Sequence, residues 1–302
     1  MYDLILPYLP IFIFLLGACV GSFLNVCIYR IPEERSLMGP RSHCRCGKPI
    51  TWYDNIPLIS WFILRGKARC CKKPFPFRYF VVEALTGVLF LLCWVLLSPV
   101  HAWVGMVFMA ILIASTFIDL DHMIIPDRFT IGGMVLGVVL SGMFPAMHLD
   151  TLSGVFLLDS VHAVLVSLLG AFVGSGMILW LALITEAVLN KDAMGFGDVK
   201  LMGAIGAFCG WQGSFFALFG GACCGTLIIA TVMLGQALGL RLSMKAIKET
   251  PRKKTKDVSD NLEWGSSVPF GPWLALGAAL YWLFFRVETL QFLSSIEVVF
   301  TQ

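Results

Sequence analysis

Charged residues are scarce in this chain. Lys, Arg, Asp and Glu make up 14% of its 302 residues, whereas a typical soluble domain has about 25%. Hydrophobic residues make up 58%, and the mean hydropathy is +0.83. This composition excludes a soluble globular protein and indicates a polytopic membrane protein. Because segments in lipid must satisfy their backbone hydrogen bonds internally, we expect an all-α fold.

Other features are also missing. No basic region precedes the first apolar run, and no clear small-residue cleavage site follows it. We therefore interpret this run as a retained first span and not as a cleaved signal peptide. No segment is large enough for a soluble domain except the first polar loop, and no internal repeat is obvious.

The apolar runs predict about eight spans, each near the roughly 20 residues needed to cross hydrocarbon. They divide the chain into a first helix at 1–28, a polar loop domain at 29–78 and a core of about seven helices at 79–302. The predicted spans are 4–28, 79–97, 102–118, 129–146, 161–189, 199–219, 220–240 and 269–285. The sixth and seventh are the least cleanly divided, because Gly210–Gly213 could be the break.

Basic residues predict the orientation. Eleven Lys and Arg lie in Arg30–Arg78 and seven in Arg241–Lys256, and with eight spans both groups fall on one side, whereas Arg286 falls near the other. The positive-inside rule makes that side cytoplasmic and places both termini outside. The same cluster could suggest nucleic acid, but topology and contact with anionic lipid head groups explain it. We expect membrane lipid, and no nucleic acid, as a partner.

Two acidic stretches lie at predicted membrane boundaries, Ile118–Asp127 and Met194–Lys200. An acid at such a position is costly and usually functional. Asp119 ends the third span and Asp198 opens the sixth, so both carboxylates are predicted at one depth on the cytoplasmic face. Two close carboxylates cannot both ionise easily; one can act as general base on a water and the other as general acid. This aspartic-protease chemistry needs neither a metal nor a covalent intermediate.

Simpler roles exist for the same acids. Asp198 stands where an N-cap would stand, and Asp127 is interpreted as a cap. Asp121 is a competing acid beside Asp119. Glu186 is a lesser candidate that could pair with Lys191. The two glycines ahead of Asp198 would let the backbone turn sharply or approach another group closely.

At these residues the chain resembles the prepilin peptidases, or type IV leader peptidases, which are GxGD-type membrane aspartic proteases. The matching motifs are Gly21–Val26, Arg30–Pro32, Trp52–Trp61, Leu64–Lys67, Arg78–Tyr79, Glu83, Asp119–Asp127, Gly195–Leu201 and Pro269–Pro272. The resemblance implies a catalytic pair supported by four motif residues: Asp119 and Asp198, with Gly195, Gly197, Lys200 and Asp127. It selects Asp119 over Asp121 because the family's aspartate stands seven residues before the proline.

The resemblance also implies an activity and a location. Family members cut the basic leader from type IV prepilins and from pseudopilins of type II secretion, after a glycine, at the cytoplasmic side of the bacterial inner membrane. Members with the large loop also N-methylate the new N-terminal residue, with S-adenosylmethionine as donor. This chain has the loop, so methyl transfer is implied, although no glycine-rich strand–helix unit marks a donor site. Glu33, Glu34, Asp54 and Glu83 are expected to help bind the cationic leader.

The ten cysteines form two groups. Six lie in apolar runs, where small apolar packing is the simplest interpretation. Four lie in the polar loop: Cys44, Cys46, Cys70 and Cys71. Family members usually carry two CxxC pairs there, which suit tetrahedral zinc; here the first pair is CxC, or HxxC with His43, and Ala68 replaces one cysteine. We expect a structural zinc ion, and the alternative is a vestigial site that folds without metal.

Three rival functions remain open at this stage. A proton-coupled transporter would use membrane-edge acids, but it predicts inverted repeats and helices broken near the midplane. A non-catalytic pilus assembly factor could share the scaffold, but it would not need the two aspartates, and both are present here. A related GxGD protease could act on another class of membrane substrate.

Overall fold

The computed structural model describes residues 6–37, 39, 44, 46–149, 152–189, 195–237 and 269–286. These residues are mostly helical; they contain no strand, and they have one isolated antiparallel bridge, between Lys67 and Pro74. The all-α prediction is therefore confirmed.

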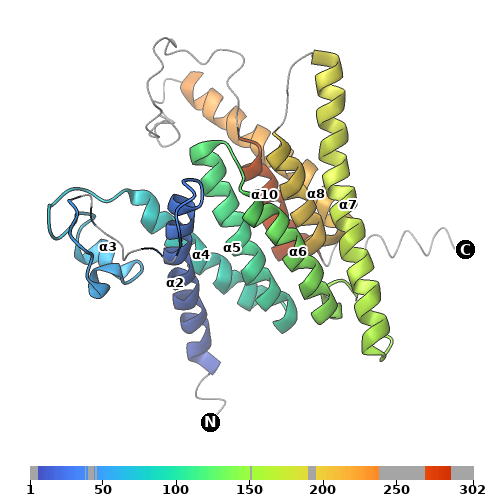
Figure 1. Cartoon of the computed structure of the whole chain (residues 1–302), viewed down its shortest axis with the longest axis horizontal. Helices are drawn as coiled ribbons and strands as arrows, with labels where there is room; N and C mark the ends of the chain where they lie inside the picture. The colour runs from blue at the N-terminus through green and yellow to red at the C-terminus, as the bar shows by residue number, and fades with distance from the viewer. Residues whose placement is uncertain are drawn as a thin grey trace, which may run out of the picture.

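The main helices form one bundle (Figure 1). They are α2 (Leu9–Arg30), α4 (Phe77–Leu96), α5 (Pro99–His122), α6 (Asp127–Met143), α7 (Phe156–Leu189), α8 (Phe196–Ala237) and α10 (Gly271–Leu280). A π-helical segment, η4 (Tyr281–Phe285), continues α10. The short elements are η1 (Leu6–Tyr8), η2 (Trp52–Asn55), α3 (Ile59–Ile63) and η3 (Pro145–Met147).

Five helices in the described part of the chain are long and apolar enough to cross a membrane: α2, α4, α5, α7 and α8. The segment Gly271–Phe285 is a shorter apolar helix. The protein is therefore a multi-pass membrane protein, whereas the count of eight spans stays a prediction. The expected basic loop after residue 240 lies outside the described residues.

The helix α8 contains a break at Gly210, whose φ of 71° and ψ of −178° lie in a region reserved almost entirely for glycine. Beyond the break, Gly213 packs against Tyr281 and Gly221 against Trp273. The second part of α8 therefore runs antiparallel to α10. The predicted boundary at residues 219 and 220 is wrong, because the helix continues through it; the alternative break at Gly210–Gly213 is correct.

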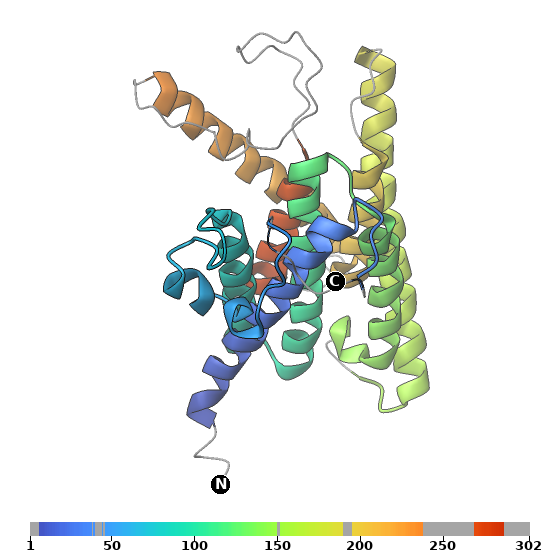
Figure 2. The same cartoon turned by 60° about the vertical axis from the view of Figure 1, so that its left-hand side comes forward.

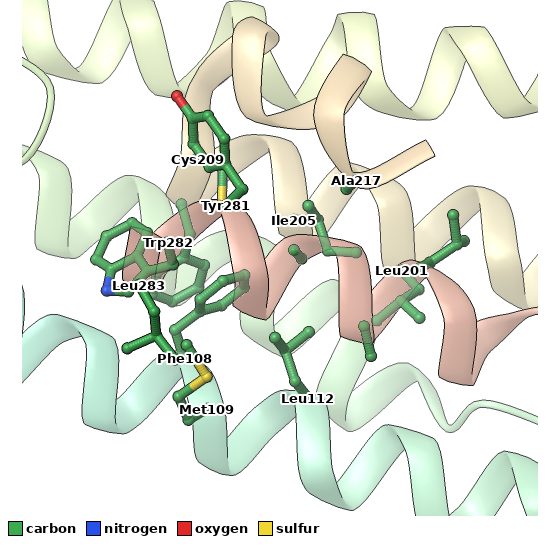
Figure 3. Packing of buried hydrophobic residues seen from close by; sticks show 14 of the residues in the cluster. Phe108, Met109, Leu112, Leu201, Ile205, Cys209, Ala217, Tyr281, Trp282 and Leu283 are labelled. Atoms are coloured by element: carbon green, nitrogen blue, oxygen red, sulfur yellow. The ribbon is translucent and has the colours of Figure 1, made fainter. Parts of the chain in front are cut away.

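Small residues lie at the close helix contacts, as is common in membrane proteins. A Cβ added at Gly170 would lie 2.8 Å from the Gly210 Cα atom, and one at Gly137 would lie 3.0 Å from the Phe208 ring. Phe208 also stacks on Phe108 of α5, with ring centroids 4.7 Å apart. Figure 3 shows this core, in which α5, α8 and α10 meet around Phe108, Ile205 and Trp282.

The outer surface of the bundle is apolar. Phe172 and Trp180 of α7 are 78% and 67% exposed, as expected of side chains that face lipid. Of the six cysteines in apolar runs, Cys27, Cys93 and Cys209 are buried, Cys224 is half-buried, and Cys19 and Cys223 are exposed. The packing interpretation is therefore wrong for Cys19 and Cys223, which lie on the outer faces of their helices.

The polar loop and the end of α5 lie at the same end of the bundle. Arg78, at the start of α4, forms an ion pair with Asp121, in the last turn of α5. The loop emerges from the end of α2, to one side of the helices (Figure 1). At the same end, the last turns of α7 and α8 project beyond the bundle (Figure 2).

Candidate functional site

Asp119 lies in the last turn of α5 and is only 6% exposed. The helix ends at Met123, whose left-handed φ of 55° turns the chain and whose amide donates to the Asp119 carbonyl oxygen at 2.9 Å. The chain then extends through Ile125 to Pro126, which is the N-cap residue of α6. This turn holds the Asp119 side chain inside the protein at the end of the helix.

Asp198 lies in the first turn of α8 and is 8% exposed. Its amide donates to the Gly195 carbonyl oxygen at 3.0 Å. Because α8 begins at Phe196, Asp198 lies inside the first turn and not at the N-cap position. The Asp119 and Asp198 carboxylates, 79 residues apart in sequence, interact electrostatically with each other. Two buried acids near enough to interact electrostatically are costly for stability, which favours a functional role.

The start of α10 completes this site. The backbone amide of Gly271 faces the Asp119 carboxyl group, and a Cβ added at Gly271 would lie 2.6 Å from Asp119 Oδ2. Ile125 packs against both Gly271 and Gly197. The N-termini of α8 and α10 therefore both meet the carboxylates, and their partial positive charge stabilises negative charge there. Within the described residues Asp119 Oδ2 accepts no hydrogen bond.

The two glycines ahead of Asp198 are less crowded than expected. An added Cβ at Gly197 would make only ordinary contact with Ile125, at 3.4 Å, and one at Gly195 would have its nearest described neighbour, Asp198 Oδ2, at 3.8 Å. Neither glycine has a positive φ. The close backbone approach occurs at Gly271 instead, and its only signal in the sequence is the Pro269–Pro272 motif. Residues 190–194, with Met194 and Lys191, lie outside the described residues.

The neighbouring acids have other partners. Arg78 pairs with Asp121 and also donates to the Phe117 carbonyl oxygen at 2.8 Å. Asp121 is therefore occupied by an ion pair that ties α4 to α5. Glu186 is exposed near the end of α7. Neither of these acids joins the two aspartates.

Asp127 does not cap α6, contrary to the prediction. It is the first residue of the helix, after Pro126, and no side-chain hydrogen bond caps the helix. Its carboxylate pairs instead with the Lys200 ammonium group at 2.6 Å. The pair joins α6 to the first turns of α8, because the long Lys200 side chain, two residues beyond Asp198, reaches across to α6.

The four loop cysteines come together as predicted. Their sulfur atoms all lie within 4.8 Å of one another, with Cys44 Sγ 3.5 Å from Cys71 Sγ and Cys46 Sγ 3.3 Å from Cys70 Sγ. Tetrahedral zinc with Zn–S bonds of about 2.3 Å requires sulfur atoms about 3.8 Å apart. The donor set therefore fits a metal ion, and the altered spacing does not prevent it. His43 lies outside the described residues.

Hydrogen bonds within this cluster separate the acidities of the thiols. The Cys46 backbone amide, together with the Cys70 and Cys71 thiols, lowers the pKa of the Cys44 thiol to about 7. Hydrogen bonds to Cys44, which has the larger effect, and to Cys46 raise the pKa of the Cys70 thiol to about 12. The Cys44 thiol therefore ionises more readily than the Cys70 thiol, and a thiolate is the form that binds metal.

A separate cavity of about 520 Å³ lies between α2, the polar loop and α4. No residue of α5, α8 or α10 lines it. It has the size of a small-molecule site, and a cofactor could bind there without touching the aspartates.

Two family models match the chain. The bacterial peptidase A24 N-terminal domain matches residues 15–97, which include the loop and the cavity, and the type IV leader peptidase family matches residues 106–230, which include both aspartates. No solved structure matches the chain significantly.

Several curated relatives are similar over most of their length. A protein of Myxococcus xanthus named prepilin leader peptidase/N-methyltransferase is 34% identical, over 89% of this chain and 88% of the relative. One of the same name from Aeromonas hydrophila is 32% identical, over 89% of each. An Escherichia coli protein, the type 4 prepilin-like proteins leader peptide-processing enzyme, is 34% identical, over 92% of this chain and 96% of the relative. By these matches the chain belongs to the type IV leader peptidase family.

Proposed function

We propose that this enzyme is a membrane aspartic endopeptidase that removes the leader of type IV prepilins and pseudopilins, with Asp119 and Asp198 as its catalytic pair. The observation that carries the proposal is that two buried carboxylates from distant parts of the chain interact electrostatically, with the Gly271 amide beside one of them. The relatives named for prepilin processing supply the substrate class.

In the proposed reaction, the ionised member of the pair takes a proton from a water molecule, which attacks the carbonyl carbon of the scissile bond. The protonated member gives its proton to the carbonyl oxygen. When the tetrahedral intermediate collapses, the carboxyl group that took the proton from water gives it to the leaving nitrogen, which departs as the amine, and the other carboxylate takes a proton from a hydroxyl of the intermediate. The N-termini of α8 and α10 favour the anionic form that the pair must keep in a buried site.

The basic residues support the cytoplasmic side of the bacterial inner membrane as the location. The loop with eleven Lys and Arg lies at the aspartate end, because Arg78 pairs with Asp121 there. By the positive-inside rule this end faces the cytoplasm. Membrane lipid surrounds the helices, and the substrate's hydrophobic helix would approach from it.

The second proposed activity is N-methylation of the new N-terminal residue with S-adenosylmethionine, as the names of the relatives suggest. The polar loop would serve this activity, with the four thiols holding a structural zinc ion. When bound, S-adenosylmethionine supplies an electrophilic methyl group on a sulfonium ion.

The test uses purified full-length enzyme, a prepilin substrate and mass spectrometry. Asp119→Asn and Asp198→Asn are each expected to lower the cleavage rate by at least about 10²-fold, because one acid–base partner is lost. Glu186→Gln, an exposed acid on α7, is the control and should cleave normally. Cleavage at the wild-type rate by both asparagine variants would refute the catalytic pair.

A further inference from the structure

The cavity beside the polar loop has walls from three parts of the chain. The helix α2 contributes Ser22, Asn25 and Tyr29, the loop contributes Trp61 among others, and α4 contributes Tyr79 and Glu83. Aromatic faces and a carboxylate together attract a cation. The cationic side chains of Arg30, Arg35 and Lys73 also line the cavity, so it offers charges of both signs and is suited to an organic molecule that carries both a cation and a carboxylate.

Glu83 is held in place at the inner wall of the cavity. Its Oε2 atom accepts the Leu58 amide at 2.8 Å, and the Ser22 hydroxyl also hydrogen-bonds to it. Leu58 has a φ of 60°, a strained conformation for a branched residue. Such strain occurs most often where a site requires it. Close packing of α2 on α4 also holds Glu83 in place, because Gly21 lies directly against the Glu83 backbone.

Two other acids of the loop, Asp54 and Glu33, are paired with arginines. Asp54, which also lines the cavity, binds Arg69 through both carboxylate oxygens at 2.8–3.1 Å. Glu33 pairs with Arg35 at 2.7 Å. Among the described residues, no ion pair engages Glu83. Glu83 is therefore the carboxylate of this cavity that can receive a cation or a proton.

The indole of Trp61 forms a rigid part of the cavity wall. Its Nε1 atom is buried and has no hydrogen-bond partner in the described part of the chain. The ring packs on Phe77 and Phe80 of α4, with centroids 5.5 and 5.1 Å away, and therefore has a fixed position. A rigid aromatic wall with an unused donor is typical of a binding site and atypical of a packed core.

We propose that this cavity is the methyl-transfer site, that it binds S-adenosylmethionine together with the N-terminal amine of the cleaved substrate, and that Glu83 is its general base. This inference rests on the proposed second activity and assigns it to a place separate from the aspartates. The Arg78–Asp121 ion pair joins α4, which carries Glu83, to α5, which carries Asp119.

Glu83 takes a proton from the substrate's ammonium group, and the lone pair of the resulting amine attacks the methyl carbon of the sulfonium. A C–N bond forms while the C–S bond breaks, and its electrons stay on sulfur, which leaves as the neutral thioether S-adenosylhomocysteine. The product is a methylated secondary ammonium group, and Glu83 releases its proton to water.

The first experiment locates the donor without measuring activity. Full-length enzyme in detergent is irradiated with S-adenosylmethionine that carries a tritiated methyl group, and the labelled peptides are sequenced. Label is expected within residues 22–30, 54–61 or 73–83, and excess S-adenosylhomocysteine should abolish it. Asp119→Asn should be labelled like wild type even though its cleavage is lost. Label in α8 or α10, or no competable label, would overturn the proposal.

The second experiment tests the base. Glu83→Gln keeps an oxygen that can accept the Leu58 amide, so the wall should stay folded. At pH 7 its methyl transfer to a cleaved pilin is expected to fall by about 10²-fold. Because an α-amine has a pKa of about 8, the variant should recover most of its rate at pH 9. Leader cleavage by Glu83→Gln is measured beside that of Glu186→Gln at both pH values, and the methyl-transfer rate is compared on substrate that has already been cleaved, so that any effect of Glu83 on leader binding is separated from the base role. Wild-type methyl transfer at pH 7, or equal loss at both pH values, would rule out the base role.

Discussion

The aspartate end of the bundle and the polar loop at residues 31–76 are built differently. The first consists of the ends of α5, α8 and α10, whose buried residues form one apolar cluster. Among the described residues of the second, the longest helix is α3, which has five residues, and none of these five is buried. Four of the five non-glycine residues with a positive φ in the described chain lie in this loop: Glu34, Leu58, Arg65 and Lys72.

This difference shows what holds each activity in place. Helix packing positions the two carboxylates, so a change of one small residue at a helix contact should disturb cleavage. The loop has almost no core and holds several strained residues, so it depends on thiols and polar contacts. The two activities should therefore respond to different perturbations.

The largest effect is expected at Gly271, on the side of helix packing. Gly271→Ala places a methyl group 2.6 Å from Asp119 Oδ2, so the carboxylate must move. A displacement of about 1 Å can lower a rate by about 10²-fold, and we expect a loss of this size in prepilin cleavage, with binding of S-adenosylmethionine unchanged. Gly197→Ala, whose methyl group would lie 3.4 Å from Ile125, is the control. A greater loss in the control would show that crowding at Gly271 is not the cause.

Metal removal should affect mainly the loop. Cys44→Ser with Cys71→Ser, or a strong chelator, is expected to remove one zinc ion per chain and to lower methyl transfer about tenfold. Cleavage of prepilin should change less than threefold, because the aspartates do not contact the cluster. Metal analysis, limited proteolysis of the loop and the two activity assays measure this. The control is Cys19→Ser, on the exposed face of α2; equal losses of both activities would remove the distinction between the regions.

Arg78 tests the connection between the regions. Its ion pair with Asp121 is partly buried, with side chains 33% and 19% exposed. Arg78→Gln is expected to destabilise the protein by about 1 kcal/mol and to lower both activities three- to fivefold. A double-mutant cycle with Asp121→Asn should show a coupling of similar size in thermal unfolding. Strictly additive effects would mean that the pair does not join the regions.

The smallest effect is expected at the Asp127–Lys200 pair. The Asp127 side chain is 60% exposed, and exposed pairs contribute about 0–1 kcal/mol. Asp127→Asn should therefore keep at least about half of the cleavage rate. A loss as large as that of Asp198→Asn would instead place Asp127 among the catalytic groups and change the assignment of the pair.

The membrane class, the helical fold and the aspartate candidates could be predicted from the sequence, because they depend on local properties. Long apolar runs can only be helices in lipid, and an acid at the end of such a run is identifiable without a structure. The choice among neighbouring acids was harder. Asp121 pairs with Arg78, which is 43 residues away in the chain, and this contact depends on how α4 packs against α5.

The position of the break in α8 also depends on contacts between helices that the sequence does not reveal. Residues 201–237 contain no charged residue and several glycines, so hydropathy cannot distinguish which glycine turns the chain. Contacts of Gly170 with Gly206 and Gly210 decide it, because two backbones can approach this closely only where neither has a side chain.

By itself, the sequence determined which groups are available: two acids at helix ends, four thiols in a polar loop and enough apolar residues for a membrane bundle. The tertiary structure alone decided which of them meet. It brings Gly271 onto Asp119, gathers adjacent Cys70 and Cys71 with Cys44 and Cys46, and places Glu83 in a cavity apart from the aspartates. Contacts between residues far apart in the chain depend on the packing of whole helices, and local patterns carry little information about such packing.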